Sequence, residues 1–575
     1  MGTPCSACAA KDAEIRKLRE QNDELRLVVR ELDKLCTLQA GDLERVKKER
    51  EKLEPNRSER IPGDVLQLAF EQFIVGVEQG AANDGGDKPM GASPAPPAAA
   101  ESPLNPPPPP PVKKPGNKGH GRRDLDTTKL PVEEVVVKPA DVLADPDKYR
   151  VVGRECSERL GYRKATYIRI RLIRPKFALI EEAAAADLTE SCGAAEPKAP
   201  QILCAEIPGY FWPRVMADVS AITQVILSKY DMCLPLHRQE RASPRCGLHL
   251  PRSTQCDWIS AAYDRTFRIV DAMMTEGCER SFCIATDATG APVRMPGACV
   301  NWHVFVFIAD ADHIVFRPTR EHSSAAIVEL LGGFKGRLLS DAALIYDTLH
   351  RDHGVVEVCC WAHMRRYIWR SRATEPVLAL EALAIIAKLF EVARATNHIT
   401  MPERTEERAR RARPLLELLD RWVLRAEARA HDKSPLRAAL TYYENQRVGL
   451  RSFLSDGRLR LDNNISEQQL RHLVLGRHNW NFFENAAGLN WYCVFRSLIA
   501  SCNLHGLEAQ DYLNEILRLA PHWPTTRMLE LSPKYWKSTR ARLSSEHRAI
   551  IEPPWVVSSE SAPPTTTSTP SRAVA

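Results

Sequence analysis

Long apolar runs are absent from this sequence of 575 residues, in which no segment approaches the roughly 20 apolar residues needed to cross a bilayer. The net charge is small, at +6, and by itself does not indicate a polyanionic partner. The sixteen cysteines are scattered through apolar segments without the spacing of a disulfide framework, and the polar N-terminus has no apolar signal region. These absences predict a cytoplasmic protein in a reducing compartment, with a core that needs no disulfides.

Residues 1–54 repeat by sevens. The a positions of this repeat are Ile15, Asn22, Val29, Cys36, Leu43 and Arg50, and the d positions are Leu18, Leu25, Leu32, Gln39, Val46 and Leu53. The mainly apolar seam predicts a coiled coil and therefore a homo-oligomer, in which Asn22 fixes the register. The alternative is a single amphipathic helix packed on the rest of the protein.

Residues 55–120 are rich in Pro, Gly and Ala and predict a disordered linker, because this composition cannot bury a core. Alternating segments in residues 121–195 then predict a small β module. Arginines lie among its strands, and they either face phosphate or belong to a solvated sheet face: Arg169, Arg171 and Arg174.

Residues 196–272 predict helices. Between residues 234 and 270, a short helix, a turn at Gly247 and a second helix form the layout of a helix-turn-helix motif. The second helix opens with side chains that can contact phosphates or base edges, namely Arg252, Ser253, Thr254 and Gln255. Helix pairs with a glycine turn also occur in structural bundles, so DNA binding by this motif is a hypothesis.

The region from residue 282 to residue 360 predicts strands and helices in alternation. The strands are expected at 282–287, 302–310, 313–318, 336–341 and 355–360, and the helices at 323–333 and 342–352. This order is that of a ribonuclease-H-like α/β fold. The first strand ends on Asp287 and the fourth on Asp341, so the two carboxylates should meet at one edge of the sheet.

Glu467 lies in the segment LDNNISEQQLR, residues 461–471. The simplest interpretation is helix capping, with Asn464 as N-cap and Glu467 three residues further on. The alternative is a third carboxylate beside Asp287 and Asp341, because three such groups suit two Mg²⁺ or Mn²⁺ ions that catalyse phosphoryl transfer on nucleic acid. Rival acids rank lower because they lie in turns or on the following helix: Asp310, Asp312, Asp347 and Asp352.

Several strings in a fixed order carry a family resemblance. They are CSERLGYRKATYIRIRLIRPKFA at 156–178, SKYDMCLPLHRQE at 228–240, PRSTQCDWI at 251–259, CWAHMRRY at 360–367 and LDNNISEQQLRHLVLGRHNW at 461–480. From about residue 121 to residue 536 the chain resembles the DDE transposases of bacterial insertion-sequence family sixty-six.

The resemblance implies a bacterial, nucleoid-associated enzyme that binds the ends of its element and cuts and joins double-stranded DNA. It also implies that two Mg²⁺ or Mn²⁺ ions are held by Asp287, Asp341 and Glu467. Accessory proteins of the same element are possible further partners. In related transposases a Cys or an Asp, three residues before a His, follows the second aspartate, and Cys360 and His363 occupy these places. Alternatively, this pair is a buried thiol and a structural histidine.

The chain departs from the family pattern in two places. Family members usually carry two CxxC pairs around the β module, whereas only Cys156, Cys192 and Cys204 lie near it here, so we expect no zinc. Many members read Asp-Glu-Thr-Pro at the first aspartate, whereas this chain reads DATGAP at 287–292. The altered turn leaves open whether this copy is active.

A helical insertion is expected at about 371–450, whose basic face either touches DNA or is solvated. After Glu467, side chains suited to base stacking and phosphate binding follow, namely Arg471, Arg477, Asn479 and Trp480.

The predicted domains are a coiled coil at 1–54, a linker at 55–120, a β module at 121–195, a helix-turn-helix domain at 196–272, a catalytic domain with its insertion at 273–500, a helical segment at 501–555 and a disordered tail at 556–575. Three functions compete: a transposase, a ribonuclease-H-like nuclease that cuts without joining, and an inactive DNA-binding protein derived from a transposase.

Overall fold

The computed structural model describes residues 61, 63–80, 132–163, 166–179, 202–213 and 215–553. The coiled coil predicted for residues 1–54 and the tail predicted for residues 556–575 lie outside these described residues. The chain divides into two compact units, residues 1–77 and 78–575, which are described separately. Within the described ranges, no helix combines the length and apolar character that crossing a bilayer requires.

Helix α2 (Gly63–Gly80) is the described part of the first unit and runs just past its end. It lies inside the segment that we expected to be a linker without secondary structure. Leu66, Phe70 and Phe73 recur at helical spacing, and this local pattern explains why the Pro-rich composition of the wider segment does not apply here.

The β module contains a sheet in the order β1-β3-β2, with β4 also paired to β3. The strands are β1 (Val132–Val136), β2 (Tyr149–Arg163), β3 (Thr166–Leu179) and β4 (Leu203–Cys204), with the short helices α3 (Ala140–Ala144) and η2 (Pro146–Lys148) between β1 and β2. β3 alternates, so that Ile168, Ile170 and Leu172 enter a core with Phe211 while Arg169 and Arg171 face the other way.

The arginines of β3 pair with glutamates of neighbouring strands. Arg171 lies 3.0 Å from Glu158 and 3.1 Å from Glu134. Arg174 lies 2.9 Å from Glu155. These ion pairs balance the charge of Arg171 and Arg174, which favours the interpretation as a solvated sheet over a phosphate-binding one.

Helices α5 (Val219–Tyr230), α6 (Leu236–Ala242) and α7 (Arg252–Arg280) follow, with the short helix η3 (Ser243–Cys246) after α6. Gly247 ends η3 with a φ of 75°, a left-handed conformation that glycine adopts without strain. The short helix, the glycine turn and the second helix lie where the sequence predicts them. Helix α7 is much longer than a recognition helix requires, because it runs on as a core helix that buries Ile259, Ile269 and Met273.

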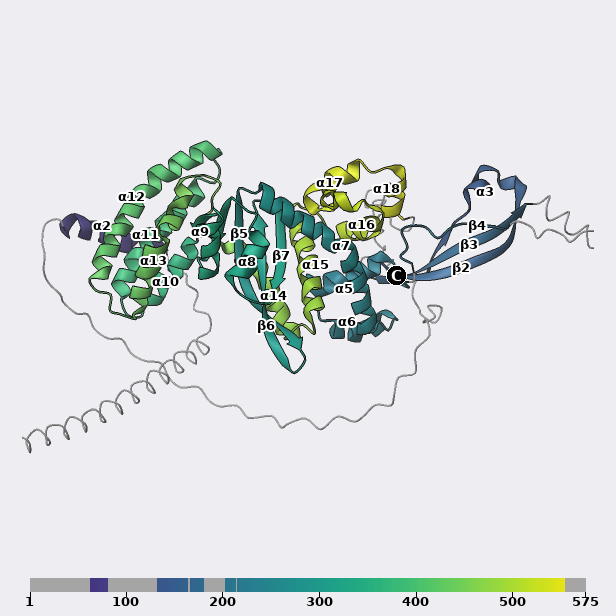
Figure 1. The fold of residues 1–575 in the computed structure, drawn as a ribbon, viewed down its shortest axis with the longest axis horizontal. Helices are drawn as coiled ribbons and strands as arrows, with labels where there is room; N and C mark the ends of the chain where they lie inside the picture. The colour runs from purple at the N-terminus through teal and green to yellow at the C-terminus, as the bar shows by residue number, and fades with distance from the viewer. Residues whose placement is uncertain are drawn as a thin grey trace, which may run out of the picture. The chain divides into compact units, whose positions relative to one another are not determined.

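The central sheet has five strands in the order β7-β6-β5-β8-β9 (Figure 1). The strands are β5 (Cys283–Met295), β6 (Ala298–Ala309), β7 (His313–Thr319), β8 (Arg337–Ser340) and β9 (Val356–Cys359), and the connecting helices are α8 (Ser324–Leu331), η4 (Leu344–Tyr346) and α9 (Asp347–Asp352). β5, β6 and β7 pair antiparallel, whereas β8 and β9 continue the sheet in parallel with β5. The mixed α/β class predicted from the sequence is confirmed.

Strand β5 is longer than predicted, since it continues past Asp287 to Met295 and forms a long hairpin with β6 (Figure 1). The extension forms because Ala291 and Val293 are fully buried, while the turn is made by Gly297 with a φ of 80°. Asp287 therefore lies within a strand on its β6 side and beyond the last paired residue on its β8 side.

Helix α15 (Ala486–Leu504) closes the free edge of β7. The backbone N–H of Ile314 donates to the hydroxyl of Ser501 at 3.0 Å, and that of Phe316 donates to the hydroxyl of Ser497 at 2.8 Å. These N–H groups would otherwise be free to pair with another strand. The two serines thus end the sheet at this edge.

The remaining described residues are helical. The insertion consists of α10 (Trp361–Ser371), α11 (Pro376–Ala395), α12 (Met401–Glu427), α13 (Pro435–Arg451) and η5 (Ser452–Leu454). After it come α14 (Asn464–Trp480), α15, α16 (Ala509–Leu519), η6 (Ala520–His522), η7 (Thr525–Leu531), α17 (Pro533–Ala541) and α18 (Ser545–Ile551). α14 contacts β5, which brings the LDNNISEQQLR segment to the sheet.

Candidate active site

Asp287 and Asp341 belong to neighbouring parallel strands, Asp287 inside β5 and Asp341 directly after β8. The last paired residues of β5 and β8 are Ala285 and Leu339, so each aspartate stands two residues further along its chain. Neighbouring strands lie about 4.8 Å apart, and residues two apart point to the same face. Ala342, with a φ of 63°, turns the chain directly after Asp341. The sheet therefore holds the two aspartates side by side at one level.

Glu467 reaches the same place on α14, whose start is tied to the sheet by Asn463. The amide of Asn463 donates to the carbonyl of Thr286 at 2.6 Å, and its backbone N–H donates to the Sγ of Cys360 at 3.2 Å. Ser466 donates to the side chain of Asn463 at 2.7 Å. Asn463 is fully buried, so these bonds are shielded from water.

The capping interpretation of Glu467 does not describe its contacts. The N-cap is Asn463, one residue earlier than expected, and its side chain makes no cap hydrogen bond because it is engaged by the sheet and by Ser466. The Glu467 carboxylate instead faces α10, where it lies 3.4 Å from Arg366 and 3.7 Å from Nε2 of His363. Both partners come from the CWAHMRRY string.

The surroundings of Asp287 raise its pKa. Burial, together with the negative charges of Asp341 and Glu467, raises the pKa of Asp287 to about 7, against a hydrogen bond from the N–H of Ala288 and the positive charge of Arg366. Burial also lowers the pKa of His363. Asp287 therefore exchanges its proton near neutral pH, instead of being ionised throughout the neutral range as an exposed aspartate is.

Carboxylate oxygens of this kind are the ligands that hard divalent cations prefer. Within the described ranges, however, no three His, Cys, Asp or Glu side chains are close enough together to form a ready-made metal group. Arg366 and His363, rather than the two aspartates, lie against Glu467. The donor chemistry fits a divalent cation, with Arg366 as the cation that balances Glu467 here.

The rival acids have other partners or positions. Asp310 accepts hydrogen bonds from the backbone N–H groups of Phe282 and Cys283 at 2.9 and 3.0 Å. Asp312 pairs with Lys534 at 2.8 Å. The other two, Asp347 and Asp352, are exposed on α9.

The first group of predicted DNA contacts opens α7. Arg252 and Ser253 are exposed and Thr254 is half-buried. Gln255 is fully buried, and its amide donates to the carbonyl of Leu250 at 3.1 Å. Its side chain therefore supports the turn before the helix and is turned away from any surface that DNA could reach.

The second group lies on the last three turns of α14. Arg471 is exposed, whereas Arg477 donates to the carbonyl of Gly290 on β5. Asn479 donates to the carbonyl of Cys233 at 3.0 Å, and Trp480 lies beneath the ammonium of Lys229, 5.2 Å from its ring centroid. Only Arg471 of these four points its polar group away from the protein.

Cys360 and His363 both lie at the junction of β9 and α10. Cys360 is fully buried and accepts the N–H of Asn463, so it helps to place α14. His363 is half-buried beside Glu467. The sequence interpretation missed Arg366 and Asn463, although His363 and Arg366 stand three residues apart, a spacing that places both on one face of a helix.

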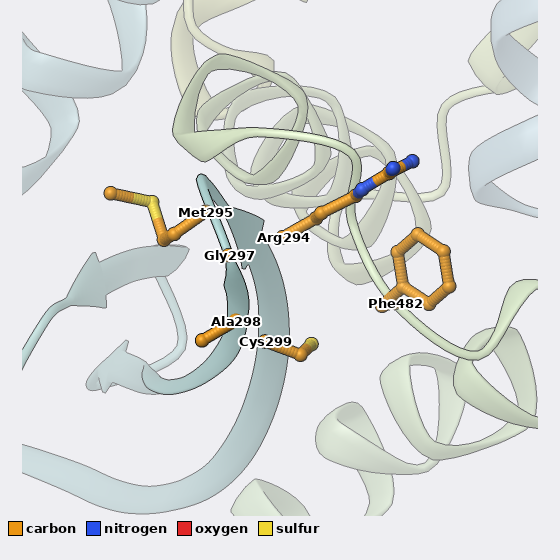
Figure 2. A pocket seen from close by; sticks show the side chains of 6 residues that line it. All are labelled: Arg294, Met295, Gly297, Ala298, Cys299 and Phe482. Atoms are coloured by element: carbon orange, nitrogen blue, oxygen red, sulfur yellow. The ribbon is translucent and has the colours of Figure 1, made fainter.

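A separate hollow of about 330 Å³ lies at the tip of the β5–β6 hairpin, between Cys299 and Phe482 (Figure 2). Its one charged lining residue, Arg294, pairs with Glu484 at 3.0 Å. This hollow contains no acid and is not part of the candidate active site.

The fold and site thus define a class of protein, a mixed α/β protein with one aspartate inside β5, a second directly after β8 and a glutamate on the later helix α14. The comparison with protein families is more specific: residues 214–490 match the family described as "Transposase IS66 family". Residues 214–490 are thus similar to this family, and the match confirms the resemblance over that stretch. The matched residues do not include the part of the resemblance that we placed on residues 121–213 and 491–536.

Curated relatives occur in Sinorhizobium fredii (strain NBRC 101917 / NGR234), and their printed names state no function. "Uncharacterized protein y4hP" is 26% identical over 363 residues, which cover 58% of this chain and 65% of the relative. "Uncharacterized protein y4jD" is 27% identical over 438 residues, with 71% and 81% covered. "Uncharacterized protein y4qI" is 24% identical over 440 residues, with 71% and 76% covered.

Proposed function

We propose that this chain is the transposase of a bacterial insertion sequence, which binds the ends of its element and catalyses DNA cleavage and strand transfer. The family domain supports a transposase function. The observation that carries the catalytic assignment is geometric: Asp287 and Asp341 each stand two residues beyond the last β5–β8 pair, and Asn463, at the start of the helix that carries Glu467, donates to the carbonyl of Thr286 beside Asp287. Three segments far apart in the chain contribute these carboxylates.

The strand order supports the same assignment. An order β7-β6-β5-β8-β9, with three antiparallel strands followed by two parallel ones, is what we expect of a ribonuclease-H-like core. In such a core the first and fourth strands are neighbours, as β5 and β8 are here. The aspartates that follow them are therefore adjacent because of the topology.

Asp287, Asp341 and Glu467 are the residues that we assign as ligands of divalent cations, Mg²⁺ or Mn²⁺. When bound, two such ions activate the attacking water or 3′-hydroxyl and stabilise the leaving oxygen of the phosphodiester. The residues of the chain prepare the site for this chemistry: Asn463 holds α14 on the sheet, and Arg366 neutralises Glu467. The proton on Asp287 leaves when positive charge enters the cluster.

For DNA binding we propose Arg252 and Ser253 at the start of α7 and Arg471 on α14, because these side chains are exposed. Thr254 contributes from its half-buried position. Phosphate contacts by such groups position the DNA, and base contacts add specificity. We further propose that the protein oligomerises through residues 1–54 and acts on double-stranded DNA in the bacterial cytoplasm.

Glu467→Gln tests the assignment. With purified protein, a DNA duplex carrying the end of the element and Mg²⁺, the variant should lose strand transfer by at least about 100-fold, because a carboxylate that acts on the reacting centre is removed. Binding of the duplex should stay within about two-fold, because Glu467 faces α10 rather than an exposed surface. The matched control is Asp347→Asn, which removes an exposed carboxylate nearby and should leave both activities unchanged.

Joined product from the wild type, lost in the Glu467→Gln variant, supports the transposase. Cleavage without joining would instead support a nuclease, and binding without any cutting would support a DNA-binding protein derived from a transposase. Equal strand transfer by Glu467→Gln and the wild type would refute the catalytic assignment.

A further inference from the structure

A cavity of about 580 Å³ lies between the central sheet and the helical insertion. Its volume is within the range of about 300–1,000 Å³ that is typical of ligand pockets. The sheet, α11, the start of α12 and the loop before α14 all contribute to its walls. Nothing described above uses this space.

The cavity adjoins the three carboxylates. Ala285, Leu339 and Ile465 line it, and each of them stands two residues before one of the three acids. Along a strand two residues correspond to about 6.6 Å, and they share a face of the sheet. A ligand in the cavity therefore lies on the same face of the sheet as Asp287 and Asp341, next to them.

The walls divide into an apolar part and a cationic rim. Ala285, Leu339, Phe390 and Ile465 supply apolar surface. The rim consists of arginines, namely Arg394, Arg404, Arg408, Arg458 and Arg460. Such a combination suits a ligand that has a flat apolar part and an anionic part.

Two of the rim arginines are structural. Arg408 is buried and donates to the carbonyls of Gly457 and Leu459 at 3.2 and 2.7 Å. Arg404 donates to the carbonyl of Thr396 at 2.9 Å. Neither guanidinium has a carboxylate partner among the residues that the structure describes, so their positive charge is offset by neutral groups, namely carbonyl oxygens and the hydroxyl of Thr396. Burial and the charge of Arg404 lower the pKa of Arg408 to about 10.

The other rim arginines are exposed. Arg394 and Arg460 form no ion pair within the described ranges, whereas Arg458 pairs with Asp456 at 2.7 Å. Two acids also line the cavity, but the carboxylate of Asp310 is held by backbone N–H groups, and Asp462 accepts the N–H of Asn464 at 3.2 Å. The cavity therefore carries excess positive charge, with Arg394 and Arg460 available to a ligand.

We propose that the cavity binds one nucleotide unit, with its phosphate on Arg394 and Arg460 and its base against the apolar wall that includes Phe390 and Ile465. The inference rests on the proposed function, since it assigns to the space beside the carboxylates a piece of the nucleic-acid substrate. The unit is either a free nucleotide or an unpaired nucleotide within DNA, and both present the same base and phosphate to the cavity. Because the loop that lines the cavity leads into α14, the bound unit also steadies the helix that carries Glu467.

The experiment uses the full chain in EDTA, so that binding is measured without catalysis. The probes are deoxyadenosine monophosphate and inorganic phosphate, followed by calorimetry, and a single-stranded oligonucleotide with one 2-aminopurine, followed by fluorescence. The double variant Arg394→Gln/Arg460→Gln should weaken nucleotide binding roughly ten-fold or more, because charge-assisted hydrogen bonds to the phosphate are lost. The matched control is Arg413→Gln/Arg421→Gln, which removes two exposed arginines of α12 outside the cavity and should have no such effect.

A second variant, Ala393→Phe, fills the cavity from α11 without changing charge and should also weaken binding. Binding of the free nucleotide identifies that source, and a response of the oligonucleotide alone identifies a nucleotide within DNA. The inference is overturned if neither deoxyadenosine monophosphate nor the oligonucleotide binds, or if inorganic phosphate binds as tightly as the nucleotide. It is also overturned if the Arg394→Gln/Arg460→Gln variant binds the nucleotide as tightly as the Arg413→Gln/Arg421→Gln control does. Loss of strand transfer in Glu467→Gln together with absent nucleotide binding would refute the cavity site and leave the proposed function standing.

Discussion

Asp287→Asn should stabilise the metal-free protein above pH 7. In the folded chain the pKa of Asp287 is raised from 3.8 to about 7, first by burial and then by the charges of Asp341 and Glu467. A carboxyl group whose pKa is higher in the folded state stabilises the fold fully below pH 3.8, and this contribution is lost as the pH rises through about 7. Asparagine has nearly the same shape and never ionises.

The expected size follows from the two pKa values. The difference between 3.8 and about 7 corresponds to about 4 kcal/mol at 1.36 kcal/mol per pH unit. Asp287 is only half-buried, so solvent screening reduces the effect to about 2 kcal/mol. A change of this size raises the apparent Tm by a few degrees in a protein of this length.

Thermal unfolding in EDTA between pH 4 and pH 8.5 measures the effect. The wild type should lose stability relative to Asp287→Asn progressively between pH 4 and about 7 and stay less stable, by a constant amount, above that, whereas Asp347→Asn, at an exposed carboxylate, should follow the wild type. Mn²⁺ should raise the Tm of the wild type at pH 8 but should not raise the Tm of the Asp287→Asn variant. Parallel curves for the wild type and Asp287→Asn would show that the cluster does not perturb Asp287, and would remove the electrostatic support for the active site.

Other predictions follow from single contacts. Asn463→Ala removes the 2.6 Å bond to the carbonyl of Thr286 and should lower strand transfer by roughly 10-fold to 100-fold while end binding, measured by gel shift, is kept; unchanged turnover would contradict its positioning role. Gly449→Ala would place a Cβ 2.4 Å from the Sγ of Cys359 and should cost about 1–3 kcal/mol of stability in urea unfolding, and an unaltered midpoint would mean that the contact relaxes freely. Deleting residues 1–54 should lower the number of chains per particle, determined from the mass in light scattering, and an unchanged number of chains would exclude the coiled coil as the oligomerisation element.

Local patterns predicted much of the central sheet. The strands expected at 302–310, 313–318 and 336–341 are found as Ala298–Ala309, His313–Thr319 and Arg337–Ser340. Alternation of buried residues is a property of neighbouring positions, so it can be recognised in the sequence. The same patterns predicted that the first strand ends at Asp287, which is too early. β5 continues to Met295 because it pairs with β6, and local composition does not indicate this pairing.

Pairing across long stretches of sequence decided the details of the candidate site. The sequence indicated Asp287, Asp341 and Glu467, but not that Arg366 would lie 3.4 Å from Glu467, or that Asn463 would bind the carbonyl of Thr286. Gln255 was expected at a DNA surface and is instead buried beneath its own turn. Each of these outcomes depends on which side chains fill the space around a residue.

By itself the sequence determined the family domain and the mixed α/β class, because motif strings and hydrophobic alternation are written in neighbouring residues. Only the tertiary structure decided which charges surround the acids, and that an arginine-rimmed cavity adjoins them. The physical reason is that a pKa and a cavity both depend on groups more than 100 residues apart in the chain, which come together only when helices pack on the sheet.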